Sequence, residues 1–496
     1  MSQPTAILDA LNIDPENEVP LYRQIYDGLR KGILNSQLVP GTRLPPSRTL
    51  ARELRVGRNT VVAAYEQLMA EGYLDSRVGA GTHVSEIPPD SLLEVGIEER
   101  VAKDKTPARN LSKRGITLST LKRAAPFFEK GAAPAFHSGL PSLELFPHQI
   151  WARLLSRRAR QPQSRLFDYQ LGAGFPALRV AIATYLGAAR GVSCGPQNII
   201  VTTGAQGALD LATRMVLDPG DTVWMEDPGY LGARGAFHGA DANIVPVPVD
   251  AEGMNPKQMP PNTPDPRLIY LTPSHQYPLG VTMSLTRRLS MLKFAHRTGS
   301  WILEDDYDSE FRFSGRPLSS LQGMDQSGSV LYMGTLAKTL FPALRIGYLV
   351  VPDHLVDSFE RALRITGQNP PAIVQATLAD FMDEGHFTAH IRRMRSIYAE
   401  RQEILLEGLD QHLKGYLTPA RPEGGMQLAA FLPKHMDDVK LRAYLRRHNM
   451  YTAALSPYYM GENAQPGLYV GFAGVPEQKI RAGTERLVAL LDAYKE

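Results

Sequence analysis

The first regular pattern of apolar positions lies in residues 20–70. Apolar side chains recur at every fourth position after residue 20, namely at Leu21, Ile25, Leu29 and Ile33. This spacing predicts a helix with one apolar face. Ser47, a favourable N-cap residue, predicts a second, short helix that ends near Leu54. A third helix follows the tight turn at residues 55–57, and its inward-facing positions are Val61, Tyr65, Leu68 and Met69.

A β-hairpin is predicted directly after the third helix. Tyr73-Leu74 and His83-Val84 can pair as strands around a tip of three small residues, Gly79-Ala80-Gly81. Glycines at such a tip let the backbone approach a phosphate or the minor groove of DNA. Two helices joined by a tight turn and followed by a hairpin form a winged helix-turn-helix, in which the start of the second helix of the pair enters the major groove.

Beyond residue 86 the pattern changes twice. Residues 87–131 lose apolar periodicity and gain charge, proline, serine and threonine, which is typical of a linker, with room for one short helix. From residue 132, short apolar runs alternate with helical segments such as 205–217 and 286–298. Runs that are apolar almost throughout predict strands buried on both faces of a mostly parallel sheet. Seven such runs occur, at 199–203, 222–226, 243–247, 267–272, 300–304, 329–334 and 346–351.

The chain is therefore expected to be an α/β protein with an N-terminal winged helix-turn-helix. The predicted boundaries are 15–86 for the DNA-binding domain, 87–131 for the linker and 132–496 for a large α/β domain with a seven-stranded sheet. The chain from about residue 371 is rich in helical patterns and is expected to end in a small α+β subdomain.

Charge supports this assignment only when it is read locally. The net charge of +3 over 496 residues is nearly neutral, but residues 43–58 hold five arginines and a single acid, Glu53. Such an excess on one face suits DNA phosphates. A solvated helical face is the alternative for any run of charge. The polar start of the third helix and the adjoining wing favour DNA binding, with double-stranded operator DNA as the partner.

The composition also indicates the cellular compartment of the protein. The one cysteine, Cys194, excludes a disulfide framework and a multi-cysteine zinc site, and we assign no metal site. No run of about 18 apolar residues is present, and the first residues lack the basic segment of a secretory signal. A cytoplasmic protein with no membrane partner is expected.

The large domain holds a set of residues that one cofactor explains. Lys338 lies just past an apolar strand, and Arg345 follows seven residues later. Asp305 and Tyr307 lie at the carboxyl end of another predicted strand, where open α/β sheets place ligand groups. Pyridoxal phosphate needs a lysine for its Schiff base, an acid for its ring nitrogen and donors for its phosphate. This set therefore predicts a site for pyridoxal phosphate.

Two further segments fit this cofactor. Gly204-Ala205-Gln206 separates a strand from a helix, and the backbone amides of a helix start can bind phosphate. Tyr230 ends another strand and can stack on a pyridine ring. Each feature alone has a plainer explanation, such as a surface lysine, a simple connection, an N-cap or metal-binding acid, or a packing aromatic. Their occurrence together at strand ends favours the cofactor.

The N-terminal segment LPPSRTLARELRVGRNTVVAAYEQLMAEGYL…GAGTHV resembles the GntR-type winged helix over nearly all of residues 20–84. This resemblance implies that four polar residues contact DNA, with a wing glycine near the backbone. The guanidinium groups of the two arginines suit base edges or phosphates. The implied residues are Arg48, Arg58, Asn59, Thr60 and the glycine Gly79.

The rest of the chain resembles fold-type I aminotransferases through TTGAQGALDL, EDPGY, TPSHQYPLG, EDDYDSEF and GTLAKTLFPALRIGY. The fused arrangement resembles the MocR/GabR-type regulators, which implies a head-to-tail homodimer. The resemblance implies that Lys338 forms the internal aldimine, Asp305 pairs with the ring nitrogen and Tyr307 with the ring hydroxyl. It further implies that Tyr230 stacks on the ring, and that the phosphate is held by Gly204, Ala205, Gln206, Arg345 and Thr335.

The sequence departs from that pattern in three places. Ala337 replaces the serine that many relatives carry before the lysine. Tyr277-Pro278-Leu279-Gly280 stands where aminotransferases have Asn-Pro-x-Gly, and the nearby His275 is a candidate substitute. Tyr469 occupies the position of the arginine that binds a substrate carboxylate. Arg234 and Arg421 are candidate replacements for that arginine.

Three functions are consistent with these features. The favoured function is a pyridoxal-phosphate-dependent regulator of transcription whose effector is an amine, an amino acid such as a taurine- or GABA-like compound, or pyridoxal phosphate itself. We expect at most residual transaminase activity from it. The alternatives are an active aminotransferase with an accessory DNA-binding module, and a DNA-binding protein whose large domain holds no cofactor.

Overall fold

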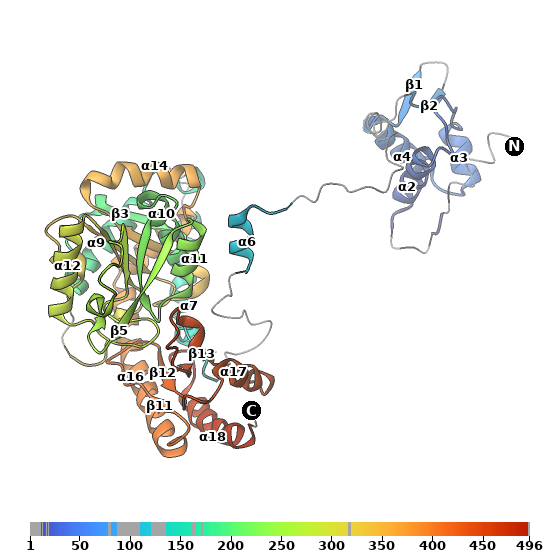
Figure 1. Ribbon diagram of the computed structural model, residues 1–496. Helices are drawn as coiled ribbons and strands as arrows, with labels where there is room; N and C mark the ends of the chain where they lie inside the picture. Colours follow the sequence, from blue (N-terminus) through green and yellow to red (C-terminus); the bar gives the residue numbers. More distant parts are fainter. Residues whose placement is uncertain are drawn as a thin grey trace. The chain divides into compact units, whose positions relative to one another are not determined.

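The computed structural model describes residues 11, 13–15, 17, 19–77, 81–86, 110–120, 135–160, 164–169, 172–315 and 319–494. The chain divides into two compact units, Met1–Asn110 and Leu111–Glu496 (Figure 1). The three predicted helices and the hairpin are all present in the described part of the first unit: α2 (Leu21–Leu34), α3 (Ser47–Glu53), α4 (Arg58–Ala70), β1 (Leu74–Arg77) and β2 (Gly81–Val84).

The first unit has its own small hydrophobic core. The predicted apolar face of α2 contributes Ile25 and Leu29, which pack with Leu50 of α3 and with Val61 and Leu68 of α4. The strands β1 and β2 pair in antiparallel fashion. This arrangement holds α3 and α4 in the geometry of a helix-turn-helix followed by a wing.

One detail of the predicted helix start is wrong. Helix α3 begins at Ser47 itself, and the cap position is taken by Pro46, with no side-chain capping hydrogen bond. The proline ring fixes φ at −52°, and a ψ of 140° gives Pro46 the non-helical conformation that a cap residue requires. Ser47 is therefore the first helical residue rather than the N-cap.

The second unit is built on a mostly parallel sheet with the order β3-β10-β9-β8-β7-β4-β5-β6. The five consecutive strands β9, β8, β7, β4 and β5 are parallel to one another. At the edges, β10 is antiparallel to both β9 and β3, and β6 is antiparallel to β5. All seven predicted strands are confirmed, and β6 is an eighth of only two residues. The strands are β3 (Ile199–Thr202), β4 (Thr222–Asp227), β5 (Asn243–Asp250), β6 (Gly253–Met254), β7 (Leu268–Leu271), β8 (Trp301–Asp306), β9 (Val330–Thr335) and β10 (Gly347–Val350).

The central strands are buried on both faces. In β7, Leu268 and Tyr270 belong to one hydrophobic cluster, whereas Ile269 and Leu271 belong to another. Successive side chains of a strand point to opposite faces, so both faces need apolar residues. The helices that accompany the sheet are α7 (His148–Arg160), α8 (Ser164–Phe167), α9 (Pro176–Arg190), α10 (Gly204–Val216), α11 (Leu231–Gly239), α12 (Leu285–Thr298), α13 (Leu321–Met324), α14 (Val356–Thr366), α15 (Ala372–Asp383) and α16 (His386–His412).

The C-terminal part forms the predicted small α+β subdomain (Figure 1). Its antiparallel sheet has the order β11-β12-β14-β13, with β11 (Thr418–Pro419), β12 (Gln427–Phe431), β13 (Ala453–Ala454) and β14 (Gly467–Gly471). The accompanying helices are α17 (Asp438–Arg447) and α18 (Glu477–Ala493). A further helix, α6 (Lys113–Thr120), falls within the predicted linker and contacts α11. Within the described residues, none of the helices combines the length and apolar character needed to cross a bilayer.

Candidate cofactor and DNA-binding sites

Lys338 lies three residues beyond the end of β9 and reaches back to the segment that precedes α7. Its Nζ donates to the carbonyl oxygen of Gly139 at 2.9 Å, and the Gly139 amide donates to Gln427 Oε1 at 2.7 Å. A Cβ at position 139 would lie 2.8 Å from Nζ and would displace the amine, and the φ of +77° at this position also favours glycine. Burial lowers the pKa of Lys338, against the opposing charges of Asp308 and Asp305. A lowered pKa increases the neutral fraction of the amine, which is its nucleophilic form.

Asp305 lies at the end of β8 with one oxygen paired and one oxygen free. The Tyr270 hydroxyl donates to Oδ2 at 2.6 Å, whereas Oδ1 is buried without a partner among the described residues. Burial raises the pKa of Asp305 to about 7, and the bond from Tyr270 opposes that rise. A buried carboxylate oxygen without a donor is a suitable partner for a protonated ring nitrogen.

Asp306, the next residue, has a different set of partners. Arg190 Nε donates to Asp306 Oδ2 at 2.7 Å, and the Tyr332 hydroxyl donates to the same oxygen at 2.6 Å. Burial alone would raise the pKa of Asp306, but the Arg190 charge and these hydrogen bonds hold it below its usual value. Because side chains alternate along a strand, β8 directs the two neighbouring carboxylates to separate environments.

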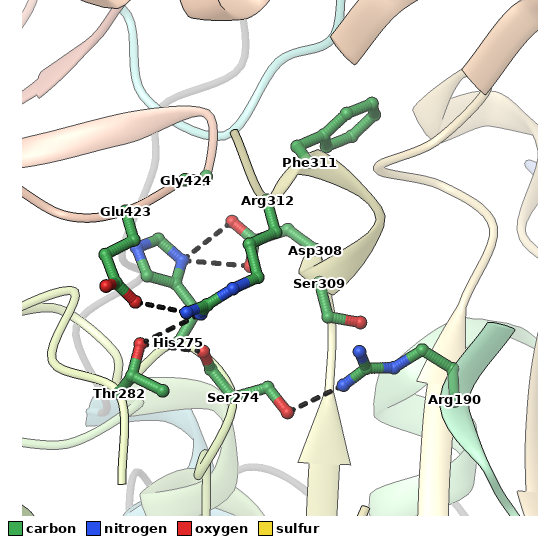
Figure 2. A pocket seen from close by; sticks show the side chains of 11 residues that line it. Arg190, Ser274, His275, Thr282, Asp308, Ser309, Phe311, Arg312, Glu423 and Gly424 are labelled. Atoms are coloured by element: carbon green, nitrogen blue, oxygen red, sulfur yellow. Dashed lines mark hydrogen bonds and ion pairs between the residues drawn. The ribbon is translucent and has the colours of Figure 1, made fainter. Parts of the chain in front are cut away.

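Tyr307 is linked to a histidine and a third acid. His275 Nδ1 lies 3.1 Å from the Tyr307 hydroxyl and 2.9 Å from Asp308 Oδ1. Figure 2 shows His275 facing Asp308, with Arg312 reaching Glu423 in the same small cavity. Burial raises the pKa of Tyr307 well above its ordinary value, so the phenol stays protonated and can donate a hydrogen bond. His275 therefore lies directly against Tyr307.

The start of α10 offers free backbone amides. Helix α10 begins at Gly204, and Thr203 in the cap position makes no side-chain capping bond. Arg345 Nη2 donates to the Thr203 carbonyl oxygen at 3.2 Å, which places its guanidinium beside the helix start. The Gln206 side chain, by contrast, donates to the Gly232 carbonyl oxygen at 3.1 Å. The predicted phosphate-binding residues Gly204, Ala205 and Arg345 thus lie together.

Thr335, another predicted phosphate ligand, ends β9 and is buried. Its Oγ1 accepts a hydrogen bond from the Ala337 amide at 3.2 Å, within the turn that leads to Lys338. The hydroxyl therefore stabilises this turn.

Five tyrosines fill the other side of the site, and we call them the tyrosine cluster: Tyr230, Tyr277, Tyr307, Tyr458 and Tyr469. The Tyr277 ring is central, with ring centroids 5.4 Å from Tyr230, 5.6 Å from Tyr307, 5.5 Å from Tyr458 and 5.3 Å from Tyr469. The rings meet edge to face, which is a favourable arrangement for aromatic pairs. Tyr230, predicted to stack on the cofactor, is therefore one part of a larger aromatic wall.

Several residues of this region were not predicted from the sequence. Asp308 falls within the EDDYDSEF motif, so its position was available as a signal. Tyr270 lies in β7, and the sequence of this strand predicts only that it is buried. Gly139 and Gln427 lie 288 residues apart in the chain, and neither belongs to a recognisable pattern.

The predicted DNA-contacting residues lie on two helices of the first unit. Arg48 is exposed on α3, whereas Arg58, Asn59 and Thr60 form the first turn of α4. Arg58 Nε lies 3.5 Å from Ser47 Oγ, which brings the starts of α3 and α4 together. Gly79 lies outside the described residues.

Comparisons with known proteins agree with this architecture. Residues 21–84 match the gntR family of bacterial regulatory proteins, and residues 141–487 match aminotransferase class I and II. The probable rhizopine catabolism regulatory protein MocR of Rhizobium meliloti is 43% identical over 96% of this chain and 95% of that protein. The pyridoxine biosynthesis transcriptional regulator PdxR of Corynebacterium glutamicum is 29% identical over 95% of each chain.

A solved structure similar to the second unit contains a phosphopyridoxyl group. The α-aminoadipate aminotransferase of Thermus thermophilus, complexed with N-(5'-phosphopyridoxyl)-L-leucine, is 28% identical with a TM-score of 0.66, over 72% of this chain and 92% of that chain. The cofactor of the aminotransferase domain is pyridoxal phosphate. Three features of the site fit this group: the Asp305 oxygen that has no partner among the described residues, the lowered pKa of Lys338, and the start of α10, where no side chain caps the helix. The chain belongs to the MocR-type regulators, in which a gntR-family DNA-binding domain precedes an aminotransferase class I and II domain.

Proposed function

We propose that this protein regulates transcription by binding an operator in double-stranded DNA with an affinity that is set at the Lys338 site. The effector is an amine, an amino acid or pyridoxal phosphate itself. One observation carries this proposal. Lys338, an amine of lowered pKa, interacts electrostatically with Asp305, a buried carboxylate with one unpaired oxygen, in a chain that also contains a gntR-type domain.

Each side chain of the site has a proposed role toward the cofactor. When bound, pyridoxal phosphate supplies an aldehyde that condenses with amines and a ring that withdraws electrons. Lys338 holds the aldehyde carbon, Asp305 keeps a proton on the ring nitrogen, and Tyr307 donates to the ring hydroxyl with His275 behind it. Tyr230 covers one ring face. The phosphate is held by the amides of Gly204, Ala205 and Gln206 in the first turn of α10, and by Thr335 and Arg345.

In this proposal, a linker connects the DNA-binding domain to the effector domain. Residues 15–86 bind DNA, with Arg48, Arg58, Asn59 and Thr60 as contacts and Gly79 in the wing. Residues 87–131 link this domain to the effector domain of residues 132–496, and two copies form a head-to-tail homodimer. A ligand shifts DNA binding only if it has different affinities for two arrangements of the dimer.

Absorbance and operator binding of the purified full-length protein test the proposal. We expect added pyridoxal phosphate to produce an absorbance band of the lysine-bound cofactor and to change the operator dissociation constant. A colourless protein whose DNA binding ignores the cofactor would contradict it. Steady amine turnover with a 2-oxo acid, unaffected by deletion of residues 1–86, would instead support an aminotransferase with an accessory module.

The recognition role of α4 predicts a selective effect of Arg58→Ala. A bidentate arginine–guanine contact contributes about 1–3 kcal/mol, so operator binding should weaken by about fivefold to about 150-fold at matched salt. The cofactor absorbance should not change. Arg364→Ala, on the exposed side of α14 in the other unit, is the control and should leave the operator affinity unchanged. Equal affinities of Arg58→Ala and the parent protein would disprove the assignment.

A further inference from the structure

The charged side chains that act on the Lys338 amine are acids, and Tyr469 stands where the aminotransferase pattern has a carboxylate-binding arginine. We infer that the effector is a primary amine that carries no carboxylate or other acidic group. This inference rests on the proposed function, because it concerns the ligand that reacts at the Lys338 site. Three features bear on it: what occupies the carboxylate position, what the nearby arginines bind, and which charges surround the amine.

A neutral, packed side chain occupies the carboxylate position. Tyr469 lies on β14 with 1% of its surface exposed, and Gln427 and Tyr307 are its polar neighbours. Burial raises the pKa of the Tyr469 hydroxyl well above its ordinary value, so it carries no charge. The ring centroids of Tyr277 and Tyr458 lie 5.3 and 6.1 Å from that of Tyr469.

The two candidate replacements for the missing arginine have partners outside the site or on the main chain. Arg234 Nη2 donates to the Pro457 carbonyl oxygen at 2.8 Å and ties α11 to the loop that carries Tyr458, whereas its Nε is buried without a partner among the described residues. Arg421 forms an ion pair with Asp410 at 2.6 Å, and the side chains are 58% and 49% exposed. Arg421 therefore lies on the surface, and Arg234 is held to the main chain through one of its nitrogens.

The arginines of the neighbouring cavity are also paired. Arg190 binds Asp306. Figure 2 shows Arg190 bonded to the hydroxyl of Ser274 and Arg312 bonded to Glu423. Each guanidinium already has a carboxylate partner. Binding a second carboxylate there would require breaking a buried or half-buried pair, which is unfavourable.

The charges that act on the Lys338 amine are negative. Asp308 and Asp305 both act on Lys338 electrostatically. His137 does not offset them, because burial and the Lys338 charge lower its pKa to about 4 and leave it neutral at physiological pH. A carboxylate on the ligand would be repelled here, whereas an ammonium group is attracted by the acids and by the faces of the tyrosine cluster.

Absorbance titration of the full-length protein loaded with pyridoxal phosphate tests the inference. The probes are matched pairs that differ by one carboxylate: tyramine and tyrosine, cadaverine and lysine, ethanolamine and serine. We expect at least one amine to shift the cofactor band at a concentration about tenfold or more below that of its carboxylated partner, because an unpaired buried charge is strongly disfavoured. Equal or stronger responses to the carboxylated members of all three pairs would overturn the inference.

Failure of the inference and failure of the proposed function are distinguishable. A protein that binds the cofactor, and whose DNA binding follows it, but that reacts with neither member of any pair overturns only the amine inference. A protein that binds no cofactor overturns the proposed function as well.

Substitution at the carboxylate position supplies an independent test. Tyr469→Arg should reduce or reverse the preference for the amines, because it introduces a guanidinium beside Gln427. Arg421→Ala should leave the preference unchanged, and a loss of binding of the carboxylated probes in this variant would show that Arg421 is the replacement. If Tyr469→Arg does not fold, the titration of the unsubstituted protein with the matched pairs still decides the question.

Discussion

Replacement of Lys338 with alanine is expected to abolish the absorbance band of bound pyridoxal phosphate. The band depends on a covalent bond between the cofactor and the lysine amine, for which alanine offers no nucleophile. Because the Lys338 amine donates one hydrogen bond, to the Gly139 carbonyl oxygen, the loss should lower the free energy of unfolding by only about 1 kcal/mol. The measurement is the absorbance spectrum of the purified variant after incubation with the cofactor and removal of the excess.

The control is Lys293→Ala, which removes an exposed lysine of α12 and should keep the band. Operator binding by the Lys338 variant should persist but no longer respond to amines. Retention of the full band in Lys338→Ala would show that another lysine holds the cofactor, and both the site assignment and the proposed function would then fail.

Replacement of Arg190 with methionine is expected to cause the largest loss of stability. The side chains of Arg190 and Asp306 are 5% and 1% exposed, and Arg190 supplies the positive charge that keeps Asp306 ionised. Removal of one partner from a buried ion pair lowers stability by about 3–5 kcal/mol, because the other charge stays buried without compensation. Urea unfolding monitored by tryptophan fluorescence measures this effect. The tryptophans at positions 151, 224 and 301 all lie in the second unit, so the signal reports that unit alone.

A double substitution separates the ion pair from simple packing. Arg190→Met combined with Asp306→Leu removes both charges and should recover part of the lost stability, because an apolar pair of similar volume can replace a buried ion pair. If the double variant is as unstable as the sum of the two single variants, the charges do not interact and the assigned role of Arg190 is incorrect.

The sheet of the second unit could be predicted because burial on both faces leaves a strong record in the sequence. Strands such as β7 and β9 are buried throughout, and the sequence there has almost no polar interruption. The two-residue strand β6 is too short to leave such a record. Ser47 misled the prediction because its N-cap preference is a local tendency, and the preceding proline had already fixed the cap geometry.

The candidate site could be predicted only where its residues follow strands. Asp305, Tyr307 and Lys338 each lie at or just beyond a strand end, and the parallel sheet brings such ends together. The contacts of Lys338 with Gly139 and of Gly139 with Gln427 join distant segments, and no short motif encodes them. The partners of Arg234 and Arg421 could not be predicted either, because a sequence shows that an arginine is present but not which oxygen it binds.

The glycine that accepts the bond from Lys338 has a consequence for how ligand control can be lost. The acceptor is a main-chain oxygen, which every amino acid possesses, so natural variation at position 139 is restricted by the φ of +77° and by bulk rather than by functional groups. A single methyl group there would crowd the reactive amine while the helices that hold DNA kept their own separate core. Under the proposed function, one small substitution at this position would leave DNA binding intact and remove its dependence on the ligand.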